Sequence, residues 1–209
     1  ETNPNEQLVK DTELVHDLTE MWYVLKSDED ADLYVGLKKK TSPKQYSQMV
    51  DDGTILNALA HYHAKEDECF FIPAGRIHAV GHGCLICVIQ QALDTACHVP
   101  AQSDRAEVGV NYQVLQDYRQ FYVPERNRGI SLVQCQYFHT SVYDIDQPLT
   151  IDIEALDSFL IATVVDGEGK MSDNESHAYN VRGGDVLLFP ATTTEISVDG
   201  RLKLLTTYV

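Results

Sequence analysis

The stretch Cys69–Gln91 constrains the fold more than any other part of the chain, because strand-forming and turn-forming residues alternate along it. Pro73–Gly75 has turn chemistry, since Pro fixes φ and Gly accepts a positive φ. A second turn, Gly81–Gly83, separates Arg76–Val80 from the strongly β-prone run Cys84–Ile89. The order strand, turn, strand, turn, strand predicts that this stretch belongs to a small β-barrel.

An internal repeat relates this stretch to the end of the chain. The segment Asp185–Tyr208 aligns with Glu68–Gln91, and Pro190 then falls on Pro73. Two copies of one β-barrel explain the repeat. Only the first copy carries His78, so we expect one functional site, in the first barrel, and a structural second barrel.

Short strands and turns fill the second half of the chain. From residue 130 onward, strand-like runs are separated by predicted turns at Asp166–Gly169, Arg182–Asp185 and Asp199-Gly200. That density of strands and turns is typical of a sandwich or a closed barrel. Together with the repeat, this predicts a mainly β protein built from two copies of one barrel.

Helical periodicity is confined to a short insertion in the first half. Apolar residues recur at spacings of three and four between 42 and 60, and a break is expected at Asp51–Gly53. Residues 4–18 also have a helical pattern. We expect a first barrel over residues 1–115 with a helical insertion at about 41–60, a connection over 116–129, and a second barrel over 130–209.

The charge and cysteine content exclude several classes of partner. A formal net charge of −16 opposes binding to phosphate backbones and to anionic membrane surfaces, so no nucleic-acid or membrane partner is expected. No run approaches the roughly 20 apolar residues of a membrane span, and the first residues do not form a signal peptide. Five cysteines are an odd number and few for a disulfide framework, which favours reduced thiols in a cytoplasm.

His78 is the candidate centre of the site. It lies just past the rigid Pro73–Gly75 turn, and His is the commonest metal ligand; the alternative is a half-buried histidine without a ligand. Glu20 precedes an apolar strand, where an unpaired charge is costly to bury, and it is the candidate partner. His61 and His63 also have ligand spacing; their alternative is a solvated strand edge. A mixed nitrogen and oxygen ligand set suits zinc.

Four motifs together resemble one enzyme family. TEMWYVL (19–25), LYVGLK (33–38), CFFIPAGRIHAVGHGCLICVIQQ (69–91) and the C-terminal LDSFLIATVVDGEGK…GGDVLLFPA look like type I mannose-6-phosphate isomerase, of the short bacterial kind. The resemblance implies two cupin-type (double-stranded β-helix) jelly-roll barrels. It also implies a zinc-dependent isomerase that interconverts mannose 6-phosphate and fructose 6-phosphate, with a small-molecule sugar phosphate as its partner.

The resemblance also assigns metal ligands. Glu20 and His78 match family zinc ligands. Two further ligands, a Gln and a His, lie upstream in the family; Glu1 stands for the Gln, as a third candidate ligand, and Asn3 stands for the His. Family members carry additional barrel strands before this position, so an N-terminal part is expected to be missing.

Other positions concern substrate and catalysis. The resemblance implies substrate binding by Arg76 and Gln91. His98 falls in the column of the family's catalytic Arg and is the candidate catalytic residue, with Arg105 as a substitute. The family's Lys before TEMWY is replaced by Leu18.

These departures leave two functions open, an isomerase and a catalytically impaired cupin that binds a sugar phosphate or a protein partner. A third alternative is an interaction module on the second barrel. The sequence leaves the oligomeric state open.

Overall fold

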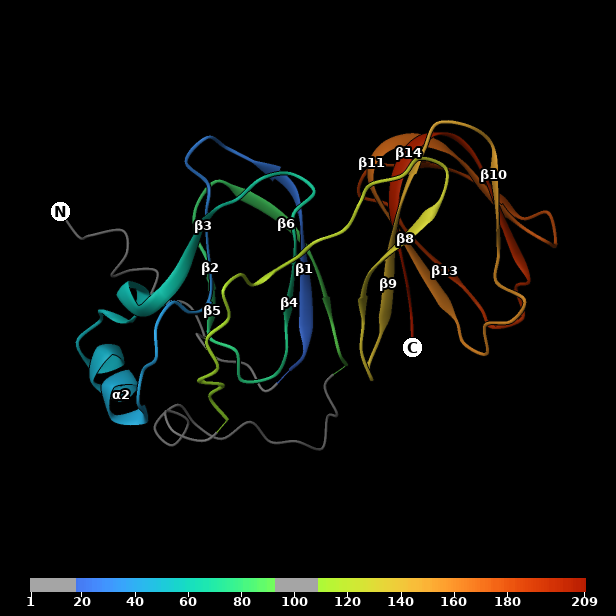
Figure 1. Cartoon of the computed structure of the whole chain (residues 1–209). Coiled ribbons are helices and arrows are strands. Elements are labelled where there is room, and N and C mark those ends of the chain that lie inside the picture. The colour runs from blue at the N-terminus through green and yellow to red at the C-terminus, as the bar shows by residue number, and fades with distance from the viewer. Residues whose placement is uncertain (1–17, 93–108) are drawn as a thin grey trace. The chain divides into compact units, whose positions relative to one another are not determined.

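The protein divides into two compact units. The computed structural model describes residues 18–92 and 109–209 (Figure 1). One unit ends at Gln120, and the other covers Phe121–Val209. Each unit has its own sheets and its own buried core.

Two small antiparallel sheets form the first unit. The four-stranded sheet has the order β6-β1-β4-β7, and the three-stranded sheet has the order β3-β2-β5. The strands are β1 (Glu20–Ser27), β2 (Asp32–Leu37), β3 (Leu59–His63), β4 (Cys69–Ile72), β5 (His78–Val80), β6 (Cys84–Gln90) and β7 (Arg119–Gln120).

A shared core joins the inner faces of these two sheets. Side chains alternate between the two faces of a strand, and Trp22 and Val24 of β1 therefore point inward together. They belong to one buried cluster with Leu33 and Val35 of β2 and with Phe70 of β4. Fully burying one such side chain contributes about 1.5–3 kcal/mol. The cluster thus stabilises the pairing of the two sheets.

The helical insertion packs beside the three-stranded sheet. Helix α2 (Pro43–Asp51) begins after Ser42, whose side chain and that of Gln45 form a capping box. A 3-10 helix, η1 (Ile55–Ala58), follows the glycine Gly53, which has a φ of +66°. Their buried residues form a second cluster with the sheet, next to which α2 lies in Figure 1. The predicted insertion is confirmed, although its last residues belong to β3.

Two long strands organise the second unit. Strands β11 (Leu160–Asp173) and β14 (Glu195–Tyr208) pair with each other along most of their length. The remaining strands are β8 (Gly129–Gln134), β9 (His139–Ile145), β10 (Leu149–Asp152), β12 (Ala178–Arg182) and β13 (Val186–Phe189). Each long strand changes its outer partner halfway along its length. Strand β11 pairs first with β13 and then with β12, and β14 pairs first with β10 and then with β9. The halves therefore belong to two different faces of one β-sandwich.

Two of the predicted turns are wrong. Asp166–Gly169 and Asp199-Gly200 lie inside β11 and β14, so the runs on either side of residue 200 are one strand. The glycines are needed because the two backbones approach closely: a Cβ on Gly200 would lie 2.5 Å from the Cα of Gly169, its partner in the ladder. A bulge next to Asp166 adds to the irregularity.

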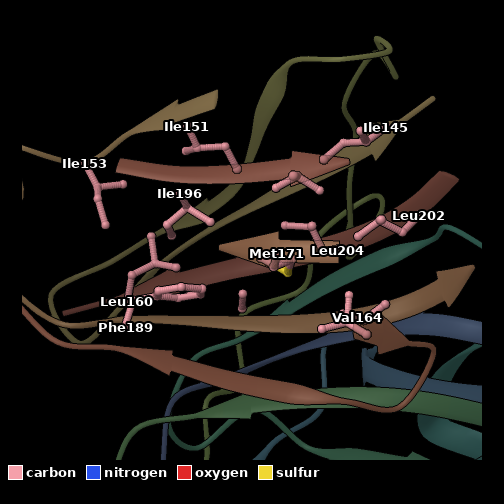
Figure 2. Packing of buried hydrophobic residues seen from close by; sticks show 13 residues of the cluster. Ile145, Ile151, Ile153, Leu160, Val164, Met171, Phe189, Ile196, Leu202 and Leu204 are labelled. Carbon is pink, nitrogen blue, oxygen red and sulfur yellow. The ribbon is translucent and has the colours of Figure 1, made fainter. Parts of the chain in front are cut away.

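The core of the second unit lies between the two faces. Leu160, Phe189 and Leu204 come from one set of strand halves, whereas Ile196 and Met171 come from the other, and all five belong to one buried cluster (Figure 2). The predicted mainly β architecture of two jelly-roll barrels with a small helical insertion is confirmed.

Within the described residues, no helix is long and apolar enough to cross a membrane. The cysteines of these residues, Cys69, Cys84, Cys87 and Cys135, are free thiols.

Candidate functional site

Glu20 and His78 meet inside the first unit. The Oε1 atom of Glu20 lies 3.0 Å from the Nε2 atom of His78, and the two side chains are only 7% and 5% exposed. Glu20 begins β1 in the four-stranded sheet, and His78 begins β5 in the three-stranded sheet. The contact therefore spans the space between the two sheets.

The alternation of side chains places both residues on the inner faces. Glu20 shares a face of β1 with Trp22, which belongs to the buried cluster between the sheets. His78 shares a face of β5 with Val80, which packs against the same cluster, whereas Ala79 packs with the helical insertion. The pairing of His78 with Val35 of β2 fixes its position along the sheet.

Hydrogen bonds fix the orientation of the imidazole and of the carboxylate. The Nδ1 atom of His78 lies 2.8 Å from the backbone carbonyl oxygen of Arg76. A carbonyl oxygen only accepts hydrogen bonds, so Nδ1 carries a hydrogen and donates it. Trp22 donates its Nε1–H to Oε2 of Glu20 at 3.3 Å, and its ring meets that of His78 edge-on with centroids 5.1 Å apart.

This arrangement fits a bound cation. With a hydrogen on Nδ1, a neutral His78 turns the lone pair of Nε2 toward the carboxylate oxygen of Glu20. Two such atoms repel each other unless a proton or a metal ion lies between them. Zinc binds His nitrogen and carboxylate oxygen at about 2.0–2.2 Å, so two of its ligand atoms are roughly 3.3 Å apart. The hydrogen bond from Nδ1 to a carbonyl is also typical of a metal-binding His.

The other predicted residues are placed as follows. Arg76 is buried; its Nη1 donates to the carbonyl oxygen of Phe71 at 2.9 Å, and its guanidinium lies over the ring of Tyr118. Burial lowers the pKa of Arg76.

Gln91 accepts a hydrogen bond through Oε1 from the backbone N–H of Thr19 at 2.8 Å, next to Glu20. Glu1, Asn3, His98 and Arg105 lie outside the described residues.

Two further residues of the structure, Trp22 and Asp32, are not predicted as site residues from the sequence. Trp22 is part of a predicted strand but not of the predicted site, although a residue two positions after Glu20 must share its face. Asp32 lies within hydrogen-bonding distance of His61, at 2.5 Å, on neighbouring strands. No signal in the sequence identifies Asp32, because the register of an antiparallel pair separated by the helical insertion is set in three dimensions.

Comparison with known proteins gives the class of the fold first. The family model described as "Mannose-6-phosphate isomerase, cupin domain" matches residues 129–209. The chain also superposes on the mannose 6-phosphate isomerase of Bacillus subtilis with a TM-score of 0.70 at 21% identity, covering 92% of this chain and 65% of that one. A phosphomannose isomerase mutant from Salmonella typhimurium gives a TM-score of 0.72 at 11% identity, covering 91% and 66%. The fold of the chain is thus that of a two-barrel cupin.

Sequence comparison then gives the particular relatives of the chain. "Mannose-6-phosphate isomerase ManA" of Bacillus subtilis is 24% identical over 91% of this chain and 64% of its own length. The mannose-6-phosphate isomerase of Streptococcus mutans is 25% identical over 91% and 63%. The chain is a relative of the mannose-6-phosphate isomerases, and the resemblance read from its motifs is confirmed. It spans a little less than two thirds of the length of these curated relatives.

Proposed function

We propose that the chain acts as a sugar-phosphate isomerase, interconverting mannose 6-phosphate and fructose 6-phosphate at a zinc site in the first barrel. Glu20 and His78 are the proposed ligands, and Glu1 is a further one. The single observation that carries the proposal is the buried contact between Oε1 of Glu20 and Nε2 of His78 at 3.0 Å. The names of the relatives in both comparisons support the reaction.

The reaction sets requirements that particular residues would meet. Bound zinc would supply Lewis-acid polarisation of the oxygen atoms of the sugar. An aldose–ketose isomerisation also moves a proton between C1 and C2, which requires a positioned acid or base. His98 is the proposed catalytic residue. Arg76 and Gln91 are the proposed substrate-binding residues; Arg76 brings a positive charge that favours a phosphate in a strongly acidic protein.

The state of the thiols bears on the compartment of the chain. The four cysteines of the described residues are free thiols, which supports a reducing compartment, and we propose the cytoplasm.

The experiment measures metal content and turnover in the same preparations. We expect about one zinc ion per chain at the Glu20–His78 site, and formation of fructose 6-phosphate from mannose 6-phosphate that a chelator abolishes and zinc restores. Glu20→Gln keeps the shape of the side chain and removes its charge, so it should lose both zinc and activity. The control is Glu195→Gln, an exposed change in the second unit. Isomerase activity that is unchanged by a chelator would refute the zinc site.

A second function is a cupin that binds a sugar phosphate without converting it. Leu18, half-buried directly before Thr19, occupies the position of the family's Lys and supplies no charge. This second function predicts that mannose 6-phosphate binds to the zinc-loaded chain, measured by calorimetry, while no fructose 6-phosphate forms. Turnover at an ordinary enzymatic rate would exclude this alternative.

A further inference from the structure

Three histidines surround Asp32 at the edge of the first unit. The Nε2 atom of His61 lies 2.5 Å from Oδ1 of Asp32, and the Nδ1 atom of His63 lies 3.6 Å from the same oxygen. On the other side, the Nδ1 atom of His82 lies 3.8 Å from Oδ2, while its Nε2 atom lies 3.2 Å from Asp30. One carboxylate is therefore shared by three imidazole rings.

Regular structure brings these side chains together. Asp32 is paired directly with His63 in the ladder between β2 and β3, and His61 lies two residues away on the same face of β3. The rings of His61 and His63 are 4.9 Å apart. His61 also stacks on Tyr34, with ring centroids 4.9 Å apart and an angle of 22° between the planes, which restricts its rotation.

The backbone holds His82 beside this pair. Gly81 donates its N–H to the carbonyl oxygen of Asp32 at 2.8 Å, and the N–H of Asp32 bonds to the carbonyl oxygen of His82 at 3.2 Å. A Cβ on Gly81 would lie 2.7 Å from the Cβ of Asp32, so only glycine permits this approach. The turn is thereby fixed against the first residue of β2.

This group lies on the face of the sheet opposite to the Glu20–His78 contact. Leu33 and Val35 of β2 point into the core between the sheets, so Asp32 points the other way. On β3, Tyr62 packs against that core, which places its neighbours His61 and His63 outside. The two groups of potential ligands are separated by the sheet.

The residue types suit a transition metal. One atom from each of Asp32, His61 and His63 lies within 4.8 Å of the others, against the roughly 3.3 Å that separates two ligands of one zinc ion. Small rotations of exposed rings close that difference, since the side chains of His61 and His63 are 40% and 73% exposed. Imidazole and carboxylate together favour zinc, copper or nickel over magnesium or calcium.

We propose that Asp32, His61 and His63, with His82 as a fourth ligand, form a second and solvent-accessible site for a divalent transition-metal ion such as Zn²⁺. Water completes the coordination, because the site opens to solvent. The proposal does not depend on the isomerase activity.

The test is zinc binding by the whole chain, measured by equilibrium dialysis with metal analysis. We expect a second zinc ion, bound more weakly than the one that Glu20→Gln removes. The affinity of this second site for zinc should fall at least about tenfold in His63→Ala and in the double variant His61→Ala/His63→Ala. The matched control is His177→Ala. It breaks another exposed His–Asp contact, in which Nδ1 of His177 lies 2.9 Å from Oδ2 of Asp173 and no second histidine of the described residues takes part. It should leave both sites unchanged.

Magnetic resonance of the unmodified protein gives an independent result. Titration with zinc should move or broaden the ring signals of His61 and His63 together, and those of His139 should stay in place. The proposal is overturned if these signals do not respond to zinc, or if the double variant binds as much zinc, as tightly, as the unmodified chain. Because the altered side chains are exposed, their removal should leave thermal unfolding nearly unchanged.

Discussion

The carboxylate of Glu20 and the imidazole of His78 face each other 3.0 Å apart across the interior of the first barrel, each on the first residue of its strand. Neither strand pairs with the other, because β1 and β5 belong to different sheets. The contact therefore depends on how the two sheets pack. Any change that shifts one sheet against the other should weaken a metal ion held by these two side chains.

Trp22 should act as a positioning residue for this contact. Trp22→Phe retains most of the buried ring but removes the Nε1–H that bonds to Oε2 of Glu20 at 3.3 Å. Loss of a hydrogen bond behind a ligand typically reduces metal affinity about 10- to 100-fold. We expect a drop in zinc affinity within that range, measured by competition with a chelating dye. Unchanged affinity in a folded variant would contradict the role of Trp22.

Gly36 should tolerate no side chain. It has a φ of +71°, and a Cβ there would lie 2.1 Å from Cζ of Tyr118, whose hydroxyl donates to the carbonyl oxygen of Leu37. Backbone strain and overpacking together predict that Gly36→Ala lowers the free energy of unfolding by about 3–5 kcal/mol in urea denaturation.

Gly53→Ala is the matched control for that substitution. Gly53 also has a positive φ, +66°, but nothing lies within 4 Å of the position that a Cβ would take there. Only the backbone strain remains, so we expect a loss of about 1–2 kcal/mol. Equal losses in the Gly36 and Gly53 variants would show that the contact with Tyr118 is unimportant.

Two histidines of the second unit should titrate in opposite directions from the usual 6.5. The side-chain hydrogen bond with Asp173 raises the pKa of His177, whereas burial lowers the pKa of His139. His177 therefore adds a small stability below pH 6.5 that is lost as pH rises through its raised pKa. His139 opposes folding as pH falls below 6.5, since the unfolded chain then binds the proton more readily.

Proton magnetic resonance of the ring signals measures both values directly. The midpoint of His177 should lie above 6.5 and that of His139 below it. Asp173→Asn should bring His177 back toward 6.5 and leave His139 unaffected. An unchanged titration midpoint of His177 in this variant would show that Asp173 does not cause the raised pKa.

Cys69 should be the least reactive of the four thiols in the described part of the chain. Burial raises its pKa to about 12, and the side chain is fully buried in β4. At pH 8 almost no thiolate forms, and reagents have no access to the sulfur. Alkylation followed by peptide mass spectrometry should label Cys135 well before Cys69 in the native protein, and both equally in denaturant. Equal native rates would indicate that the first barrel opens frequently.

The pattern of the sequence predicts most strands because apolar alternation and turn residues are local signals. The order strand, turn, strand, turn, strand predicted for Cys69–Gln91 is confirmed, as β4, β5 and β6. The errors come from glycines. Gly167, Gly169 and Gly200 resemble turn residues in the sequence, but in the fold they allow two paired strands to approach closely and to bulge.

The candidate site is only partly predictable. Glu20 and His78 stand out because a carboxylate and an imidazole beside rigid β-structure are unusual, and a family motif contains each. The group around Asp32 does not stand out in the sequence, because it depends on a pairing between β2 and β3 across the helical insertion.

The sequence by itself determined where most strands lie, that the barrel is duplicated, and that one copy carries an imidazole and a carboxylate suited to a metal ion. Those properties follow from local alternation, turn chemistry and residue type. Only the tertiary structure decided that Glu20 and His78 touch, that Trp22 supports them, and that Asp32 lies among three histidines. These relationships depend on strand register and on the packing of one sheet against another, which are set by contacts between residues distant in the sequence.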